Sequence, residues 1–416
     1  MAQQHLEPTD PTRLAGPVLS PVTGPVPAAA LAGYLRAQAT EFLRALRLHR
    51  EAGAGTASSE GSAEAALALR RSARRISGSL HTFQAVLDPD WSEAMRPELA
   101  WVSGTLALEH ACSARLERLL LALHRLSGTA FPAQADAGSR TGTARSAAPA
   151  PAAPGASART GTRTATASGP AEPTAATAVS ERGKLTVGAA RAGALLDRQL
   201  TLARTRAHST ALQALGSSRF HAVADKVAVL ASEVPLTPAA GSADLRPLAE
   251  AARERLVDAV AALPLVTAGS PYNAEALLHG LSPDPAPHPQ DVPWHQVRLL
   301  LRLHRYAREV LYAAVSAPTG TEGPADRTAR TGGPAGNTGS AAPPPNVGLV
   351  AAGEALDRHR DASEASAAAA HAARTPRIAP ATAYALGVLH ADQRHDVEAA
   401  RYAFQHCWQT DVVGSL

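Results

Sequence analysis

Apolar residues recur three and four positions apart through most of this 416-residue chain, and no segment keeps a period of two. That spacing is typical of helices with one buried face and argues against a β-sheet. We therefore predict an all-α protein, with helices at Leu31–His49, Ala63–Leu87, Trp91–Leu126, Val179–Leu215, Arg219–Ser232, Ala243–Leu263, Trp294–Ser316, Gly348–Ala373 and Ala381–Gln409.

Four stretches of Ala, Pro, Thr, Gly and Ser interrupt the helical pattern, at Met1–Pro27, Ala52–Gly61, Phe131–Thr177 and Ala317–Pro345. They lack the apolar surface needed to offset chain entropy, so we predict that they are disordered. The expected organisation is a tail over 1–27, a first half over 28–130, a linker over 131–178, a middle and second half over 179–316, a linker over 317–345 and C-terminal helices over 346–412.

The charge composition does not identify a ligand by itself. The sequence has 40 Lys and Arg against 36 Asp and Glu, an excess too small to indicate a nucleic-acid binder by itself. Only Lys184 and Lys226 are lysine, and the planar guanidinium of arginine suits phosphate oxygens. The alternative is a GC-rich genome, which would produce the same excess of Arg and Ala.

Other features exclude several classes of protein. No apolar run is long enough to cross a bilayer, and the first residues lack the layout of a secretory signal. We therefore predict a soluble, cytoplasmic protein without a membrane partner. The two cysteines, Cys112 and Cys407, cannot form a disulfide framework or a four-thiolate zinc site. His390, His395 and His406 lack the spacing of zinc ligands, so no metal and no cofactor is expected.

The helix expected at Ala63–Leu87 has one apolar stripe and, on the opposite side, the arginines Arg70, Arg71, Arg74 and Arg75. No acidic residue lies between Glu64 and Asp88. Arginines this close repel one another unless an anion lies among them. A solvated basic face, which binds nothing, is the alternative from this helix alone.

The helix expected at Trp294–Ser316 repeats this design. His295, Arg298, Arg302 and Arg305 fall within an arc of about 80°, and residues along a helix advance about 1.5 Å each. Tyr306 and Glu309 border the row, and Glu309 is expected to hold Arg305, four residues earlier. A row of positive charge of this kind suits an extended anion, so we predict a polyanion site.

His295 has several interpretations. A phosphate contact is favoured, because a bound anion would stabilise the charged imidazole. A structural role and acid–base catalysis remain as alternatives. Neighbouring arginines disfavour a metal ion, since they oppose a second cation.

The two basic helices, and the segments that follow them near Glu98–Trp101 and after Gly353, look like copies of one another. We expect them to line a shared groove or pore around a pseudo-twofold axis.

The sequence resembles the CHAD family, named for a conserved-histidine α-helical domain. The first basic helix matches the family pattern at Arg70, Arg74, Arg75, Leu80 and Phe83, with Leu67 where the family has a histidine. The second matches at His295, Arg298, Arg302, Arg305, Tyr306 and Glu309, with Arg302 in place of a lysine. The segment ending at His359 and Asp361 also looks like family positions.

The resemblance implies two related helical bundles whose basic central surface binds inorganic polyphosphate, and a protein that can collect on polyphosphate granules. The expected contacts are His295, Arg298, Arg302 and Arg305, assisted by Arg70, Arg74 and Arg75. Tyr306, Glu309, His359 and Asp361 would support them, with Asp361 anchoring an arginine of the basic helix. The Glu-x-Glu-x-Lys motif of the triphosphate tunnel enzymes fused to some members is absent from the sequence.

We therefore expect a binding protein and not an enzyme, since the sequence has no acidic cluster of the kind that phosphoryl chemistry uses. The second hypothesis is a scaffold or regulator that kept the fold, lost most affinity for polyanions with Leu67, and binds a protein partner. Nucleic acid ranks lower, because Trp91, Trp101, Trp294 and Trp408 are too scattered to stack bases.

Overall fold

The computed structural model describes residues 24–54, 59–128, 175–265, 267–270, 274–281, 288–316 and 347–413. Within these ranges the protein contains helices and no strand, which confirms the predicted all-α class. The α-helices are α1 (Ala28–Ala54), α2 (Ser59–Thr82), α3 (Pro89–Ser127), α4 (Ala175–Leu215), α5 (Ser218–Ser232), α6 (Arg246–Ala261), α7 (Ala274–Gly280), α8 (Val292–Ser316), α9 (Val347–Ala373) and α10 (Pro380–Val413).

Short 3-10 turns connect several of these helices, at η2 (Gln84–Val86), η3 (Pro238–Ser242), η4 (Thr267–Gly269) and η5 (Pro289–Asp291). The sequence analysis missed α7, because seven residues span only about two turns and give too few repeats to establish a period. None of the described helices is both long and apolar enough to cross a membrane.

The four stretches predicted to be disordered lie largely outside the described residues. The prediction is wrong at some of their edges, since α1 and α2 extend into the second stretch and α4 extends into the third. It is also wrong for the end of the tail. Val26 is buried, its backbone N–H donates to Asp244 Oδ1 at 3.0 Å, and Leu245 N–H donates to the carbonyl of Val26 at 2.9 Å. Burial and backbone pairing with a distant segment therefore order these residues.

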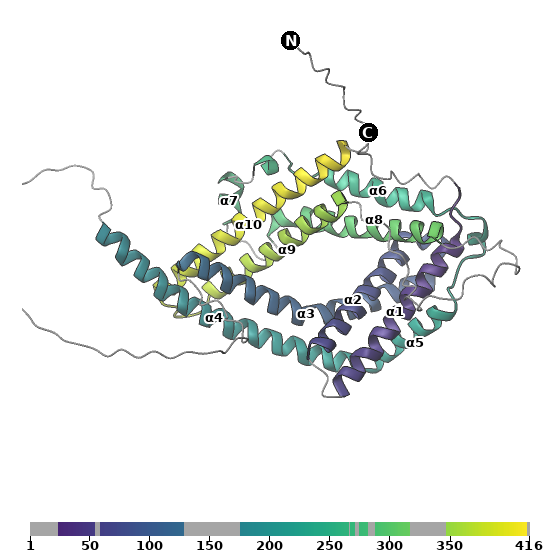
Figure 1. The fold of residues 1–416 in the computed structure, drawn as a ribbon, viewed down its shortest axis with the longest axis horizontal. Coiled ribbons are helices and arrows are strands. Elements are labelled where there is room, and N and C mark those ends of the chain that lie inside the picture. Colours follow the sequence, from purple (N-terminus) through teal and green to yellow (C-terminus); the bar gives the residue numbers. More distant parts are fainter. Residues whose placement is uncertain are drawn as a thin grey trace, which may run out of the picture.

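Four helices form the centre of the fold. The helices α2, α3, α9 and α8 each contact the next, and α8 contacts α2, so they close into a ring (Figure 1). A second layer packs against them, with α1 on α2, α4 on α3, α6 on α8 and α10 on α9. The pseudo-twofold relation between the two basic helices stays a prediction.

Three hydrophobic cores hold this ring. The first lies among α1, α2, α5, the first half of α3 and the second half of α8, and it contains Phe42 and Phe83. The second joins the rest of α3 to α4, α9 and α10 around Leu119. The third joins the start of α8 to α6, α9 and α10 around Trp294 and Phe404. Because α3 and α8 each belong to two cores, apolar burial fixes the ring without filling its middle.

Candidate functional site

The two basic helices predicted from the sequence meet at Gly78 of α2. A Cβ atom on this glycine would lie 2.6 Å from Tyr306 Cδ2 and 3.3 Å from Leu303 Cδ2. Any larger residue would force the side chain of Tyr306 to shift, so the glycine permits this close contact. Tyr306, predicted to border the basic row, therefore lies in the contact between the two helices.

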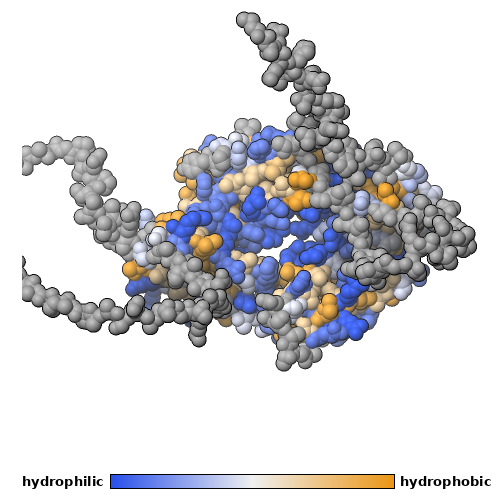
Figure 2. Space-filling view, in the orientation of Figure 1, coloured by the Kyte–Doolittle hydropathy of each residue, from blue (hydrophilic) through white to orange (hydrophobic). Residues whose placement is uncertain are grey.

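Near this contact, five arginines from three helices converge in what we call the central basic cluster: Arg70, Arg74, Arg298, Arg302 and Arg360. The charges acting on Arg70 include those of Arg298, Arg302 and Arg360, and those acting on Arg74 include Arg70, Arg302 and Arg298. Their helices border the middle of the ring, where Figure 2 shows an opening surrounded by hydrophilic surface. The sequence prediction that both basic helices face one site is consistent with this convergence.

Burial, followed by repulsion from neighbouring arginines, lowers the pKa of Arg70, Arg74 and Arg298. The pKa of Arg74 falls to about 9, which still leaves this guanidinium charged at neutral pH. Burial makes the larger contribution to these lowered pKa values, and the remainder shows that the positive charges destabilise one another. A bound anion would relieve that repulsion.

Carboxylates compensate only part of the cluster. Arg298 donates to Asp357, and Arg360 donates to Asp361 through Nε at 2.9 Å. Among the described residues, no carboxylate lies within ion-pair distance of Arg70, Arg74 or Arg302. In particular, the Nε of Arg70 is buried without a hydrogen-bond partner in the described part of the chain.

Ser103 of α3 supplies a neutral contact to the same cluster. Its hydroxyl oxygen accepts a hydrogen bond from Arg74 Nε at 3.0 Å, and Ser103 is buried. This bond fixes the direction of the guanidinium but leaves its charge uncompensated. Arg74 is therefore an oriented donor that has no counter-ion among the described residues, as an anion site requires.

Glu309 does not hold Arg305, so that expectation is wrong. Its carboxylate accepts hydrogen bonds from Arg75 Nε at 2.8 Å and from the hydroxyl of Tyr34 at 2.8 Å. Glu309 is only 16% exposed, whereas Arg305 lies on the exposed side of α8. The contact between α2 and α8 brings Arg75 to Glu309, and Arg75 is therefore already paired, unlike Arg70 and Arg74.

Tyr34 of α1 was missed by the sequence analysis. Burial, followed by the charge of Glu309, raises the pKa of its hydroxyl, which stays protonated as a donor. Tyr34 and Glu309 are 275 positions apart, and no local pattern marks that pairing.

Asp361 also departs from its predicted role. It binds Arg360, its neighbour on α9, while Asp357 binds Arg298 of the basic helix. The side of α9 that approaches α8 contains Gly353, where a Cβ would lie 3.4 Å from Arg305 Nη1. Asp357 and Arg360 follow Gly353 by four and seven residues and share its face, whereas Asp361 lies off that face.

His295 and His359 occupy different surroundings. His295 is half-buried at the start of α8, and Arg298 and Arg360 are among the charges that act on it, so it borders the central basic cluster. His359 is 1% exposed, with its ring 5.5 Å from that of His295 and 5.6 Å from that of Trp294. Desolvation by burial is the largest cause that lowers the pKa of both imidazoles. His359 therefore supports its neighbours and does not face solvent.

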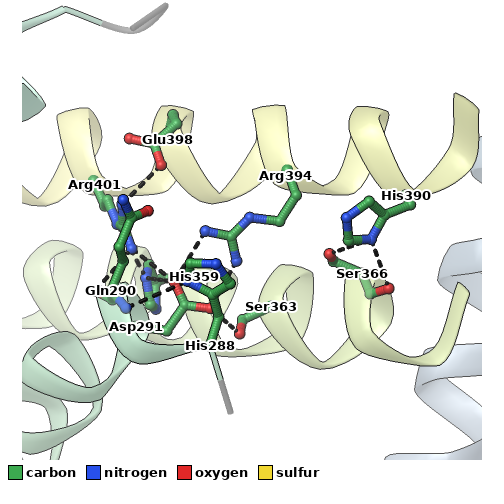
Figure 3. Close-up of polar contacts among 10 residues, drawn as sticks. All are labelled: His288, Gln290, Asp291, His359, Ser363, Ser366, His390, Arg394, Glu398 and Arg401. Atoms are coloured by element: carbon green, nitrogen blue, oxygen red, sulfur yellow. Dashed lines mark hydrogen bonds and ion pairs between the residues drawn. The ribbon is translucent and has the colours of Figure 1, made fainter. Parts of the chain in front are cut away.

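Behind His359 lies a buried network that the sequence analysis missed (Figure 3). Asp291 accepts hydrogen bonds from Arg394 Nη1 at 2.7 Å and Arg401 Nη2 at 2.6 Å, and Arg401 Nη1 donates to Glu398 at 2.7 Å. Arg401 Nε also donates to His359 Nε2 at 3.3 Å. We call these five residues the Asp291 network. It joins the turn before α8 to α9 and α10.

The pKa of Asp291 falls to about 2. Burial acts to raise it, but the hydrogen bond and charge of Arg394, together with His359 and Ser363, outweigh burial. The carboxylate is therefore ionised at neutral pH and balances the buried arginines. Unlike the central basic cluster, this network is internally compensated.

The site contains no evident metal centre. In the described ranges no group of three or more His, Cys, Asp and Glu side chains could hold a metal ion.

Comparisons with known proteins show the family to which this chain belongs. A family model described as the CHAD domain matches residues 37–328. Among solved structures, "PptA from Streptomyces chartreusis" is 59% identical in sequence, with a TM-score of 0.65. The similarity covers 93% of this chain and 100% of that one. A comparison with curated proteins found no match.

Proposed function

Since this chain belongs to the CHAD domain family, we propose that it binds inorganic polyphosphate at the opening between α2, α3, α8 and α9. The observation that carries the proposal is the convergence of Arg70, Arg74 and Arg302 without a carboxylate partner among the described residues. Charge-assisted contacts from guanidinium to phosphate oxygens are among the stronger hydrogen bonds in proteins. Polyphosphate supplies one such group after another along its chain.

The arrangement of the donors favours an extended anion over a compact one. Arg298, Arg302 and Arg305 lie on one face of α8, and the first and last are separated by about 10 Å along the helix axis. Arg70 and Arg74 add donors from α2, near Arg298 and Arg302. A single phosphate group could reach only a small part of this set, whereas a chain of phosphates can contact several members at once.

We propose binding without catalysis. The described residues offer no group of acidic or histidine ligands for a metal ion, and phosphoryl transfer usually depends on metal ions held in that way. His295, which borders the cluster, would be a neutral hydrogen-bond partner before an anion arrives, because its pKa is lowered mainly by burial. In the cell, we expect the protein to collect where polyphosphate collects.

The test is calorimetric titration of the full chain with long-chain polyphosphate at two salt concentrations, with duplex DNA as competitor. We expect tight binding that weakens as salt rises, because the contacts are ionic. We also expect that DNA does not displace the polyphosphate, because the site lies inside the ring of helices, where a duplex would not fit. Displacement by DNA would indicate a general polyanion surface. No binding at either salt concentration would contradict the proposal and support a scaffold that binds a protein partner.

A further inference from the structure

The face of α2 that carries Arg74 continues to His81, seven residues later. Seven residues make about two turns, so the two side chains project from the same side of the helix, about 10 Å apart along its axis. Gly78, where Tyr306 of α8 contacts α2, lies between them. His81 is therefore beyond the crossing point of the two basic helices.

The register between α2 and α3 places Arg96 opposite His81. The two helices are joined by a short connection through η2 and run antiparallel, and Arg74 Nε binds Ser103 Oγ at 3.0 Å. His81 follows Arg74 by seven residues on α2, and Arg96 precedes Ser103 by seven residues on α3. Because the helices are antiparallel, His81 and Arg96 lie opposite each other. Helix α6, which also contacts α2, adds Arg255. Arg96 and Arg255 are the charges that act on His81.

This second basic cluster, made of His81, Arg96 and Arg255, has no compensation. Within the part of the chain that the structure describes, neither arginine has a carboxylate at ion-pair distance. Arg253, on the same helix as Arg255, shows the contrast, because it binds Glu250 at 2.7 Å. Burial, followed by Arg96 and Arg255, lowers the pKa of His81. Three donors from three helices thus converge without a counter-ion.

We propose that the second basic cluster is a further phosphate-binding subsite, which takes a distant part of the polyphosphate chain that occupies the central basic cluster. This inference rests on the proposed function. The two clusters have the same chemistry: guanidinium groups from different helices that lack carboxylates. Tyr306 of α8 packs on Gly78 between the two clusters, so a chain that contacts both must pass around this helix contact. That path is longer than three phosphates, so a long chain can reach both clusters and tripolyphosphate cannot.

The experiment compares the wild-type protein with the double variant Arg96→Ala/Arg255→Ala, using tripolyphosphate and long-chain polyphosphate as separate ligands. We expect the Kd for the long chain to rise about tenfold or more, since two charged contacts are lost, while the Kd for tripolyphosphate stays unchanged. The matched control is Arg36→Ala/Arg206→Ala. It removes the same charge from two exposed positions and should change neither Kd.

Two results would overturn the inference while leaving the proposed function intact: an unchanged Kd for the long chain, or equal losses for both ligands. If instead the wild-type protein fails to bind long-chain polyphosphate, the proposed function itself fails. Should the double alanine variant fold poorly, Arg255→Glu replaces it, because Arg255 is exposed and reversal of its charge leaves the core untouched. That variant should weaken long-chain binding selectively, and equal affinity for the long chain would again contradict the subsite.

Discussion

The central basic cluster and the Asp291 network use the same side chains with opposite partners. In the network, Arg394 and Arg401 are 2% and 5% exposed, and Asp291 and Glu398 balance them. In the cluster, Arg70, Arg74 and Arg302 lie near one another without a carboxylate at ion-pair distance among the described residues.

The difference teaches that the role of an arginine is set by what surrounds it. An arginine that is buried and paired with a carboxylate stabilises the packing of helices. Removal of its partner leaves an uncompensated charge in the interior. Held near other arginines without a counter-ion, it raises the energy of the empty site and makes anion binding favourable. Stability should therefore depend on the network, and affinity on the cluster.

The largest effect is expected from Asp291→Ala. This change leaves Arg394 and Arg401 buried without their shared carboxylate, so the free energy of unfolding should fall by about 3–5 kcal/mol. Urea denaturation measures the loss. The control is Asp357→Ala, which removes an exposed carboxylate paired with Arg298 and should cost about 1 kcal/mol or less. Similar losses of unfolding free energy in both variants would contradict the claim that stability depends on the Asp291 network more than on the central basic cluster.

Next in size is the effect of Arg302→Glu on binding. It replaces an uncompensated donor in the central basic cluster with a negative charge, so the affinity for polyphosphate should fall about 100-fold, or about 2.7 kcal/mol. The circular dichroism spectrum should stay helical, because Arg302 is not part of a core. Arg36→Glu makes the same charge change on the exposed side of α1 and should reduce affinity far less. Equal losses would mean that net charge, not the cluster, governs binding.

A smaller effect concerns pH and the network. Burial, followed by the charge of Arg401, holds the pKa of His359 well below 6.5. As pH falls, this imidazole therefore takes up a proton in the unfolded chain before it does so in the folded protein. Stability should therefore fall as pH drops below about 6.5, and His359 should contribute up to about 1.4 kcal/mol per pH unit. Chemical denaturation at a series of pH values should show a flatter dependence for His359→Gln. The same slope in both proteins would place the proton uptake elsewhere.

The smallest effect should follow from Glu309→Gln. This change removes the charge that pairs with Arg75 but keeps an acceptor for the hydroxyl of Tyr34. Arg75 would then join the unpaired arginines, and the affinity for polyphosphate should rise about threefold at low salt. Titration of the variant beside the wild type measures the gain. A loss of affinity would show that the pair of Arg75 and Glu309 positions α2 for binding.

Local patterns predicted much of the fold. The spacing of apolar residues placed nine of the helices, because each buries one face and that face repeats with the helical period. The same periodicity put Arg298 and Arg302 on one side of α8 and Arg70 and Arg74 on one side of α2. The structure brings these four residues together.

The pairings could not be predicted, because they join residues far apart in the sequence. The four-residue spacing predicts that Glu309 binds Arg305. Because α2 and α8 cross at Gly78, Glu309 instead accepts hydrogen bonds from Arg75 and Tyr34. Asp361 is expected to anchor an arginine of the basic helix, but Asp357, which the sequence analysis does not single out, binds Arg298 instead. Asp291 and Arg394 are 103 positions apart and carry no local signal of their contact. Helix faces follow from the sequence, but the choice between carboxylates needs the packing of helices.

The most direct measurement of the central claim is a crystal structure of the full chain grown with long-chain polyphosphate. We predict a chain of phosphate density in the opening between α2, α3, α8 and α9, with oxygens within hydrogen-bond distance of Arg70, Arg74 and Arg302. Phosphate density bound elsewhere on the surface, with the opening free of it, would contradict the account.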